Sequence, residues 1–159
     1  MKSIFVDTSA LIAIGNKRDA FHRQALQIRE ELKQTNRHFV TTNAVLLEFG
    51  NTFSSVTLKP IAIKLIEALK QSSKWNCIQI DEVILNKGFG LYKQVQDKEW
   101  GLVDCTSIIV AKDLKINEIH KGEFSMLVGA RWCSQAYSNP ILNQISNVGR
   151  PSSVQPTSL

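Results

Sequence analysis

Short apolar segments that alternate with amphipathic segments constrain this chain more than any other feature. Three segments have the composition of buried strands: Ile4 to Val6, His38 to Thr42, and Trp75 to Ile80. Between and after them, apolar residues recur at spacings of three and four, which is typical of helices with one buried face. Strands separated by helices favour a largely parallel sheet with helices on both faces. The sequence therefore predicts an α/β fold.

The expected helices are bounded by residues that favour helix ends. Thr41, Thr42 and Asn43 offer cap chemistry for one helix, Asp81 caps another, and Pro60 stands in the first turn of a third. Helices are predicted over about 8–14, 21–35, 44–53, 61–71 and 104–114, and a further one after Asp81. In the helix after Asp81, the residues expected to face inward are Val83, Ile84, Leu91 and Val95.

Composition limits the class of protein. A chain of 159 residues with 43% hydrophobic residues suits one domain with a substantial core. No apolar stretch reaches the roughly 20 residues that cross a bilayer, and the N-terminus lacks the order of a signal peptide, so we expect a cytoplasmic protein without membrane contact. The charge of +5 suits a polyanionic partner such as nucleic acid. Cys77, Cys105 and Cys133 are far apart and form no CxxC motif, which predicts reduced structural thiols and no zinc site.

The regular pattern ends near Ile116. Residues 117–120 are compatible with a fourth short strand, but from Lys121 on neither the helical nor the strand period persists, and the last twenty residues are mostly polar. We therefore expect a domain over 1–120 and an atypical C-terminal segment over 121–159, disordered from about residue 139.

Three acidic residues interrupt apolar surroundings. Asp7 ends the first predicted strand, Glu48 lies in an apolar helix, and Asp104 begins the last one. Burying a carboxylate is costly unless it is paired or binds a metal, and clustered carboxylates are the ligands that Mg²⁺ or Mn²⁺ prefers. A shared metal site explains all three. The alternative is three separate explanations, with Asp7 and Asp104 as helix caps and Glu48 facing solvent.

Other hydrolase chemistries have less support. His22, His38 and His120 are scattered among a helix, a strand start and the C-terminal region, so a Ser-His-Asp arrangement is not indicated. Phosphatases that place an Asp after the first strand need a second Asp two residues later, where this chain has Ser9.

The segments around these three acids resemble known motifs. FVDTSALIA, TTNAVLLEFGN and DKEWGLVDCTS are similar to the three acidic motifs of PIN-domain nucleases, especially the VapC-type toxins of bacterial toxin–antitoxin pairs, and they follow one another in the expected order. The resemblance covers about residues 2–118. It implies an α/β/α sandwich with a mainly parallel sheet, cleavage of RNA with Mg²⁺ or Mn²⁺, and a cognate antitoxin as partner. It also implies Asp7, Glu48 and Asp104 as metal ligands, with Thr8 and Ser107 as polar neighbours that orient ligands or water.

The sequence departs from the family after Asp104. Where the family has a fourth acidic residue, this chain has Glu123, 19 residues after Asp104, and it lacks the His-Phe pair and closing strand that should follow. We therefore assign Glu123 only as a weakly placed fourth ligand and expect reduced nuclease activity. The alternative function is a degenerate PIN-fold protein that binds an antitoxin or RNA without cutting. A homodimer is a further candidate assembly.

Overall fold

The computed structural model describes residues 3–116, and its centre is a three-stranded parallel sheet. The strands are β1 (Ser3–Phe5), β2 (His38–Thr42) and β3 (Trp75–Ile78), in the order β1-β2-β3. Both pairs are parallel, with Phe5 opposite Val40 and Val40 opposite Asn76. All three strands therefore end at the same edge of the sheet.

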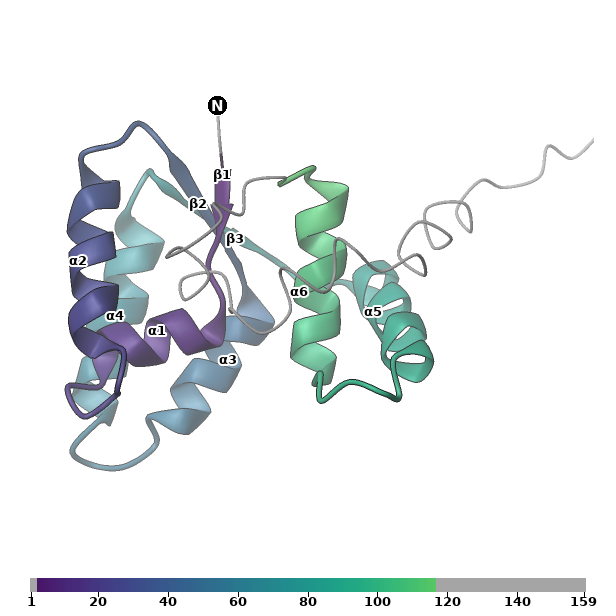
Figure 1. Cartoon of the computed structure of the whole chain (residues 1–159), viewed down its shortest axis with the longest axis horizontal. Helices are drawn as coiled ribbons and strands as arrows, with labels where there is room; N and C mark the ends of the chain where they lie inside the picture. The colour runs from purple at the N-terminus through teal and green to yellow at the C-terminus, as the bar shows by residue number, and fades with distance from the viewer. Residues whose placement is uncertain (1–2, 117–159) are drawn as a thin grey trace, which may run out of the picture.

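Helices cover both faces of this sheet. Figure 1 shows α1, α2 and α4 on one side of the strands and α5 and α6 on the other. This arrangement confirms the predicted α/β/α sandwich with a parallel sheet. The helices are α1 (Thr8–Gly15), α2 (His22–Lys33), α3 (Asn43–Thr52), α4 (Lys59–Gln71), α5 (Glu82–Gln94) and α6 (Leu102–Asp113).

Local chemistry sets several of these helix ends as the sequence predicted. The Thr42 hydroxyl accepts a hydrogen bond from the Val45 amide at 3.1 Å and so caps α3. Asp81 caps α5 in the same way, accepting from the Ile84 amide at 2.8 Å. Pro60 stands in the first turn of α4, where its missing N–H costs nothing.

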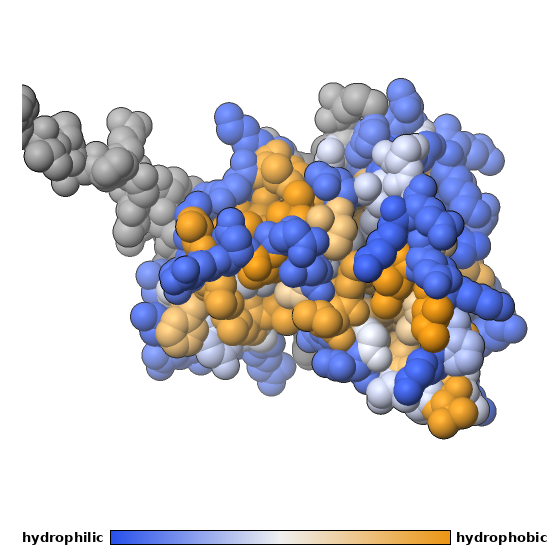
Figure 2. Space-filling model, turned by 180° about the vertical axis from the view of Figure 1, so that it is seen from behind, coloured by the Kyte–Doolittle hydropathy of each residue, from blue (hydrophilic) through white to orange (hydrophobic). Residues whose placement is uncertain are grey.

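Two apolar residues of the predicted helices do not face the core, and for Val83 this overturns the prediction. Phe21 is 51% exposed because it stands at the N-cap of α2, outside the helix's apolar face. Val83 is 61% exposed in the first turn of α5, although Leu91 and Val95 on the same stretch are buried as expected. Some apolar residues therefore reach the surface, as the orange areas among blue ones in Figure 2 illustrate.

Gly88 allows α5 and α6 to approach closely. A Cβ atom at Gly88 would lie 2.5 Å from Thr106 Cγ2 and 3.2 Å from the Thr106 backbone. Only a residue without a side chain fits at this crossing. Because α6 carries Asp104, the contact helps to fix the position of that carboxylate.

Some sequence predictions fall outside the described residues. They are the fourth strand over 117–120, the C-terminal segment over 121–159 and the fourth acid, Glu123. Within the described residues, no helix combines the length and apolarity needed to span a membrane.

Candidate functional site

Asp7 lies where β1 passes into α1, at the carboxyl edge of the sheet. It is 5% exposed and occupies the N-cap position of α1 in extended conformation, yet its side chain makes no capping hydrogen bond. Its Oδ2 instead accepts a hydrogen bond from the Ser9 hydroxyl at 3.5 Å. The alternative in which the Asp7 carboxylate caps the helix therefore does not describe this structure.

Glu48 is exposed, as in the alternative that had it facing solvent, so its carboxylate does not lie in an apolar interior. The middle of α3 contacts the rest of the protein on one side only, so Leu47 beside it is also 68% exposed. Even so, Glu48 is tied to the segment of Asp7. The buried Thr8 hydroxyl donates a hydrogen bond to Glu48 Oε2 at 2.5 Å. This contact joins the first and second acidic segments.

Asp104 is half-buried in the first turn of α6. Its Oδ2 accepts a hydrogen bond from the Gly101 amide at 2.7 Å, so one oxygen does act as a cap. Burial raises the pKa of Asp104, the Gly101 hydrogen bond opposes this shift, and the negative charge of Glu48 raises the pKa further. The second and third acidic segments are thus close enough to interact electrostatically.

Ser107 follows Asp104 by one turn on α6 and is completely buried. Its hydroxyl has no hydrogen-bond partner among residues 3–116. Buried hydroxyls are normally paired because leaving one unpaired costs about 1–3 kcal/mol. A hydroxyl in this state, one turn from Asp104 on the same helix, is available to a water molecule or a ligand.

The donor set fits a hard divalent cation in its chemistry. Asp7, Glu48 and Asp104 offer carboxylate oxygens, and pairwise interactions connect Thr8 to Glu48 and Glu48 to Asp104. Within the part of the chain that the structure describes, however, no group of three or more acidic, His or Cys side chains stands close enough to hold an ion. Mg²⁺ often binds through only one or two carboxylates and keeps several waters. The carboxylates present are enough for such a site.

Sequence reasoning did not assign two contacts that organise this edge. Ser9 was considered as the position where a phosphatase needs a second Asp, but its hydroxyl supports Asp7. Asn43 was considered a cap, but its side chain accepts from the Ile80 amide at 2.9 Å and donates to Gln79 at 3.1 Å. The short separation of Ser9 from Asp7 was a usable signal, whereas the partners of Asn43 are more than thirty residues away.

The cysteines behave as the sequence predicted within the described residues. Cys77 and Cys105 are free thiols. Burial, together with the negative charge of Asp104, raises the pKa of Cys105 to about 12. A thiol that stays protonated is a poor nucleophile, so Cys105 is not a candidate nucleophile.

Comparisons with known proteins agree with this fold. The sequence model of the PIN domain matches residues 4–123. A similar solved structure is the crystal structure of Mycobacterium tuberculosis VapC20, a toxin that cleaves the sarcin–ricin loop. It has a TM-score of 0.64 and 24% sequence identity, and the match covers 76% of this chain and 92% of that one. No curated protein matches the sequence.

Proposed function

Because the chain belongs to the PIN domain family, we propose that it is a divalent-metal-dependent endoribonuclease and the toxin of a toxin–antitoxin pair. One observation carries the proposal: the hydrogen bond from Thr8 to Glu48 joins two acidic segments 40 residues apart at the edge where parallel strands present their ligands. The charge of Glu48 in turn acts on Asp104.

The proposed roles follow from the contacts of each side chain. Asp7, Glu48 and Asp104 would hold Mg²⁺ or Mn²⁺, with Glu123 as a fourth candidate outside the described residues. The bound ion would activate water and neutralise charge on the scissile phosphate. Ser9 supports Asp7, Thr8 orients Glu48, and the Gly101 amide fixes one oxygen of Asp104. The buried Ser107 hydroxyl would position water or a ligand oxygen.

The proposed substrate and partners follow from charge and from the family. A net charge of +5 favours the RNA backbone electrostatically. Since VapC20 cleaves the sarcin–ricin loop, a hairpin with that sequence is a rational first substrate beside unstructured RNA. A cognate antitoxin and a second copy of the chain are the proposed protein partners, and the cytoplasm is the proposed location.

A cleavage assay with matched variants tests this function. We expect RNA cleavage that requires Mg²⁺ or Mn²⁺ and falls at least about 100-fold in Asp7→Asn, since outer-shell partners alone typically contribute 10–100-fold. Asp97→Asn is the control, because the Asp97 side chain is 72% exposed and pairs only locally with Lys98. Equal activity of Asp7→Asn and the wild type would refute the proposed site.

The alternative function is binding of RNA or antitoxin without cleavage. It is favoured by the observation that Glu48 and Asp104 each already use one oxygen in an internal hydrogen bond. Fluorescence anisotropy with labelled RNA separates the two functions. Tight binding that survives Asp7→Asn, without any metal-dependent product from the wild type, would establish the alternative.

A further inference from the structure

The side chain of Asn43 continues the pairing of β2 and β3 beyond the last residues of the two strands. The ladder ends with Thr42 opposite Ile78, because β2 passes into α3 at the next residue. Beyond that point Asn43 serves in place of a strand residue: its Oδ1 accepts a hydrogen bond from the Ile80 amide at 2.9 Å, and its Nδ2 donates to Gln79 Oε1 at 3.1 Å. A carboxamide offers the same donor and acceptor as a peptide group, so one side chain extends the sheet at its carboxyl edge.

This contact ties the helix of Glu48 to the pair of helices that positions Asp104. Asn43 is the first residue of α3, and Glu48 lies in the middle of the same helix. Ile80 directly precedes Asp81, whose carboxylate caps α5. Helix α5 packs closely on α6, which carries Asp104 in its first turn. Asn43 therefore links the elements that hold two of the three proposed ligands.

The position of Glu48 is sensitive to how α3 is held. Because Glu48 and its neighbour Leu47 are exposed, the helix is fixed at its N-terminus and along its buried side. Glu48 follows Asn43 by five residues, which is about 7.5 Å along the helix axis. A tilt of about 10° at Asn43 would displace Glu48 by about 1 Å, and a misplacement of about that size in a reacting site costs roughly 100-fold in rate. The same tilt would strain the hydrogen bond from Thr8 to Glu48.

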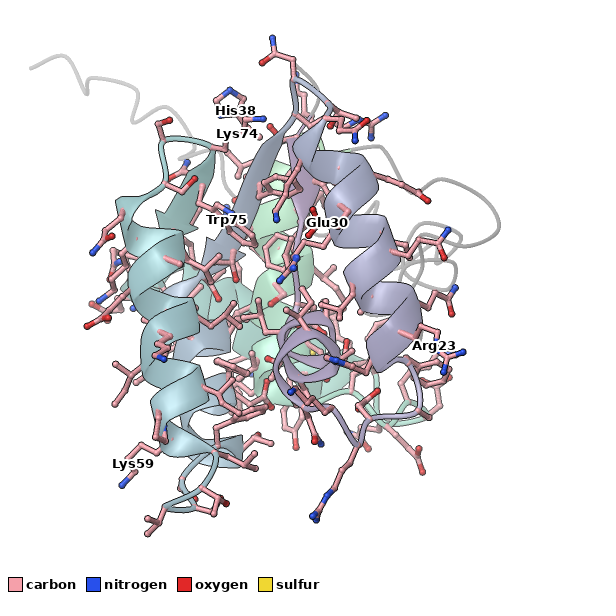
Figure 3. All side chains as sticks on the ribbon, turned by 90° about the vertical axis from the view of Figure 1, so that its left-hand side faces the viewer. Arg23, Glu30, His38, Lys59, Lys74 and Trp75 are labelled. Carbon is pink, nitrogen blue, oxygen red and sulfur yellow. The ribbon has the colours of Figure 1, made fainter. Side chains whose placement is uncertain are left out.

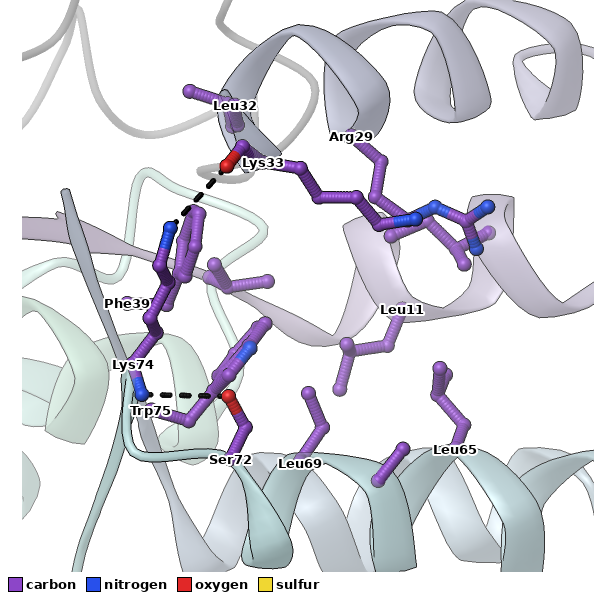
Figure 4. A pocket seen from close by; sticks show the side chains of 13 residues that line it. Leu11, Arg29, Leu32, Lys33, Phe39, Leu65, Leu69, Ser72, Lys74 and Trp75 are labelled. Atoms are coloured by element: carbon purple, nitrogen blue, oxygen red, sulfur yellow. Dashed lines mark hydrogen bonds between the residues drawn. The ribbon is translucent and has the colours of Figure 1, made fainter. Parts of the chain in front are cut away.

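The amino edge of the sheet, where its strands begin, is held by different contacts. The Phe39 amide donates to the Lys74 carbonyl at 2.8 Å, and the rings of Phe39 and Trp75 stack with centroids 5.0 Å apart. The Lys74 ammonium donates to the carbonyls of Lys33 at 3.2 Å and Thr35 at 3.1 Å. Figure 3 shows Lys74 and Trp75 at this end of the strands, and Figure 4 shows them beside a pocket of about 290 Å³ between α1, α2 and α4. A variant of Lys74 therefore tests the stability of the same strand pair without touching the carboxyl edge.

We propose that Asn43 is a positioning residue of the carboxylate site. It acts through α3: by pairing with the chain beyond β3, its amide sets the direction in which the helix presents Glu48 to Thr8. Where it concerns cleavage, this inference rests on the proposed nuclease function. Where it concerns the position of Glu48, it does not. A side chain that only stabilised the fold would leave Glu48 in place when its amide was replaced.

Replacing the amide by an apolar group of similar size separates these two roles. Asn43→Leu removes both hydrogen bonds, and leucine is the better helix former. Asn43→Ala is a second variant without the amide. Asn43→Asp is the conservative rescue, because it keeps an acceptor for the Ile80 amide, and the exposed Gln79 can turn its own amide to donate to the other oxygen. Lys74→Met is the matched control, since it removes two hydrogen bonds at the amino edge.

The carbon of the Glu48 carboxylate reports on its surroundings in the metal-free protein. In Asn43→Leu and Asn43→Ala, its NMR signal should move toward the frequency that it has in Thr8→Val, where the hydrogen bond to Glu48 is deleted. The signal should stay near the wild-type frequency in Asn43→Asp and Lys74→Met. An unchanged signal in both variants without the amide would overturn the proposal. This readout does not depend on whether the protein cuts RNA.

Cleavage kinetics test the consequence for catalysis. We expect kcat to fall about 10- to 100-fold in Asn43→Leu, the usual effect of losing a group that orients a ligand, while KM for RNA stays within about twofold. Asn43→Asp should recover most of kcat, and Lys74→Met should keep it. Equal losses of kcat in Asn43→Leu and Lys74→Met would overturn the proposal, since fold stability alone would then be responsible. A wild type without metal-dependent cleavage would refute the nuclease function instead, and the carbon signal of Glu48 would then decide the role of Asn43.

Discussion

The two edges of the sheet carry opposite charges and satisfy them differently. The carboxyl edge holds Asp7 and Asp104 at helix N-termini, and the amino edge holds Lys33 and Lys74 at the C-terminus of α2. Both placements agree with the helix dipole. At the amino edge, the cations bind Glu30 or backbone carbonyls. At the carboxyl edge, burial raises the pKa of Asp104 and the charge of Glu48 adds to this shift, so like charges oppose each other.

The charges of the amino edge therefore stabilise the fold, whereas those of the carboxyl edge do not. Ion pairs and capped carbonyls favour the fold, whereas neighbouring carboxylates work against it until a cation binds. Neutralising a charge should therefore have opposite effects on the free energy of unfolding at the two edges. The following predictions test the comparison, from the largest expected effect to the smallest.

Removing the Thr8 hydroxyl should affect catalysis most. Thr8→Val deletes the hydrogen bond to Glu48 while keeping the shape of the side chain. If the proposed nuclease function holds, we expect RNA cleavage to fall about 10- to 100-fold, the usual effect of losing a partner that orients a ligand. Thr8→Ser keeps the donor and should recover most of the activity. Similar losses in both variants would mean that packing, rather than the hydroxyl, is responsible.

Filling the crossing of α5 and α6 should destabilise the fold and displace Asp104. In Gly88→Ala the new methyl group would lie 2.5 Å from Thr106 Cγ2. We expect a loss of about 1–3 kcal/mol in the free energy of unfolding, measured with urea. Gly90→Ala is the matched control, since nothing lies within 4 Å of its Cβ position. It should stabilise α5 by up to about 1 kcal/mol. Equal effects of the two variants would contradict the close packing.

Neutralising the amino edge should reduce stability. Lys74→Met removes the hydrogen bonds to the carbonyls of Lys33 and Thr35 but keeps the aliphatic stem. We expect a loss of about 1 kcal/mol in urea unfolding. Lys64→Met, on the exposed side of α4, removes the same charge and should change stability little. If Lys74→Met were more stable than the wild type, the proposed difference between the two edges would be wrong.

Replacing the Asp104 carboxylate by an amide at the carboxyl edge should increase the stability of the fold in metal-free buffer at pH 7. The pKa of Asp104 is raised above its ordinary value of 3.8, so the folded state binds its proton more tightly than the unfolded chain does. Stability from this group is therefore present at low pH and is lost as pH rises through the raised pKa. Asp104→Asn keeps an acceptor for the Gly101 amide and avoids that loss.

The pH dependence provides the check on this last prediction. The thermal midpoint of Asp104→Asn should exceed that of the wild type at pH 7, and the difference should shrink below pH 3.8. Adding millimolar Mg²⁺ should raise the midpoint of the wild type and not that of Asp104→Asn. A wild type that is unaffected by Mg²⁺ and Mn²⁺ would count against an intact metal site.

The sequence predicted the strands and helices well because local chemistry determines their ends. Thr42 and Asp81 cap helices as expected, and β2 has the predicted bounds. The exposure of Val83 was not predicted, and that of Glu48 was only one of two alternatives, because an apolar run does not say which side of a helix meets the sheet. The pocket between α1, α2 and α4 was also not predicted, since its walls come from residues scattered from Val6 to Trp75.

The candidate site was predictable in composition but not in geometry. Asp7, Glu48 and Asp104 were identified because charged residues interrupted apolar segments. Which oxygens they offer depends on neighbours such as Thr8 and Gly101. The Gly101 contact spans three residues and agrees with Asp104 as a helix cap, whereas no spacing rule gives the contact from Thr8 to Glu48 across 40 residues. Their assignment as metal ligands stays a prediction.

The parallel sheet also determines when the candidate site forms during synthesis. Its three carboxylates are spread from residue 7 to residue 104, and the strand that pairs with β1 among residues 3–116 begins at residue 38. Such long-range contacts must wait for the connecting helices. A nascent chain that has not yet released α6 from the ribosome therefore has no complete carboxylate set. If the site cuts RNA, the ribosome that makes this protein is not exposed to it until translation of the domain is nearly finished.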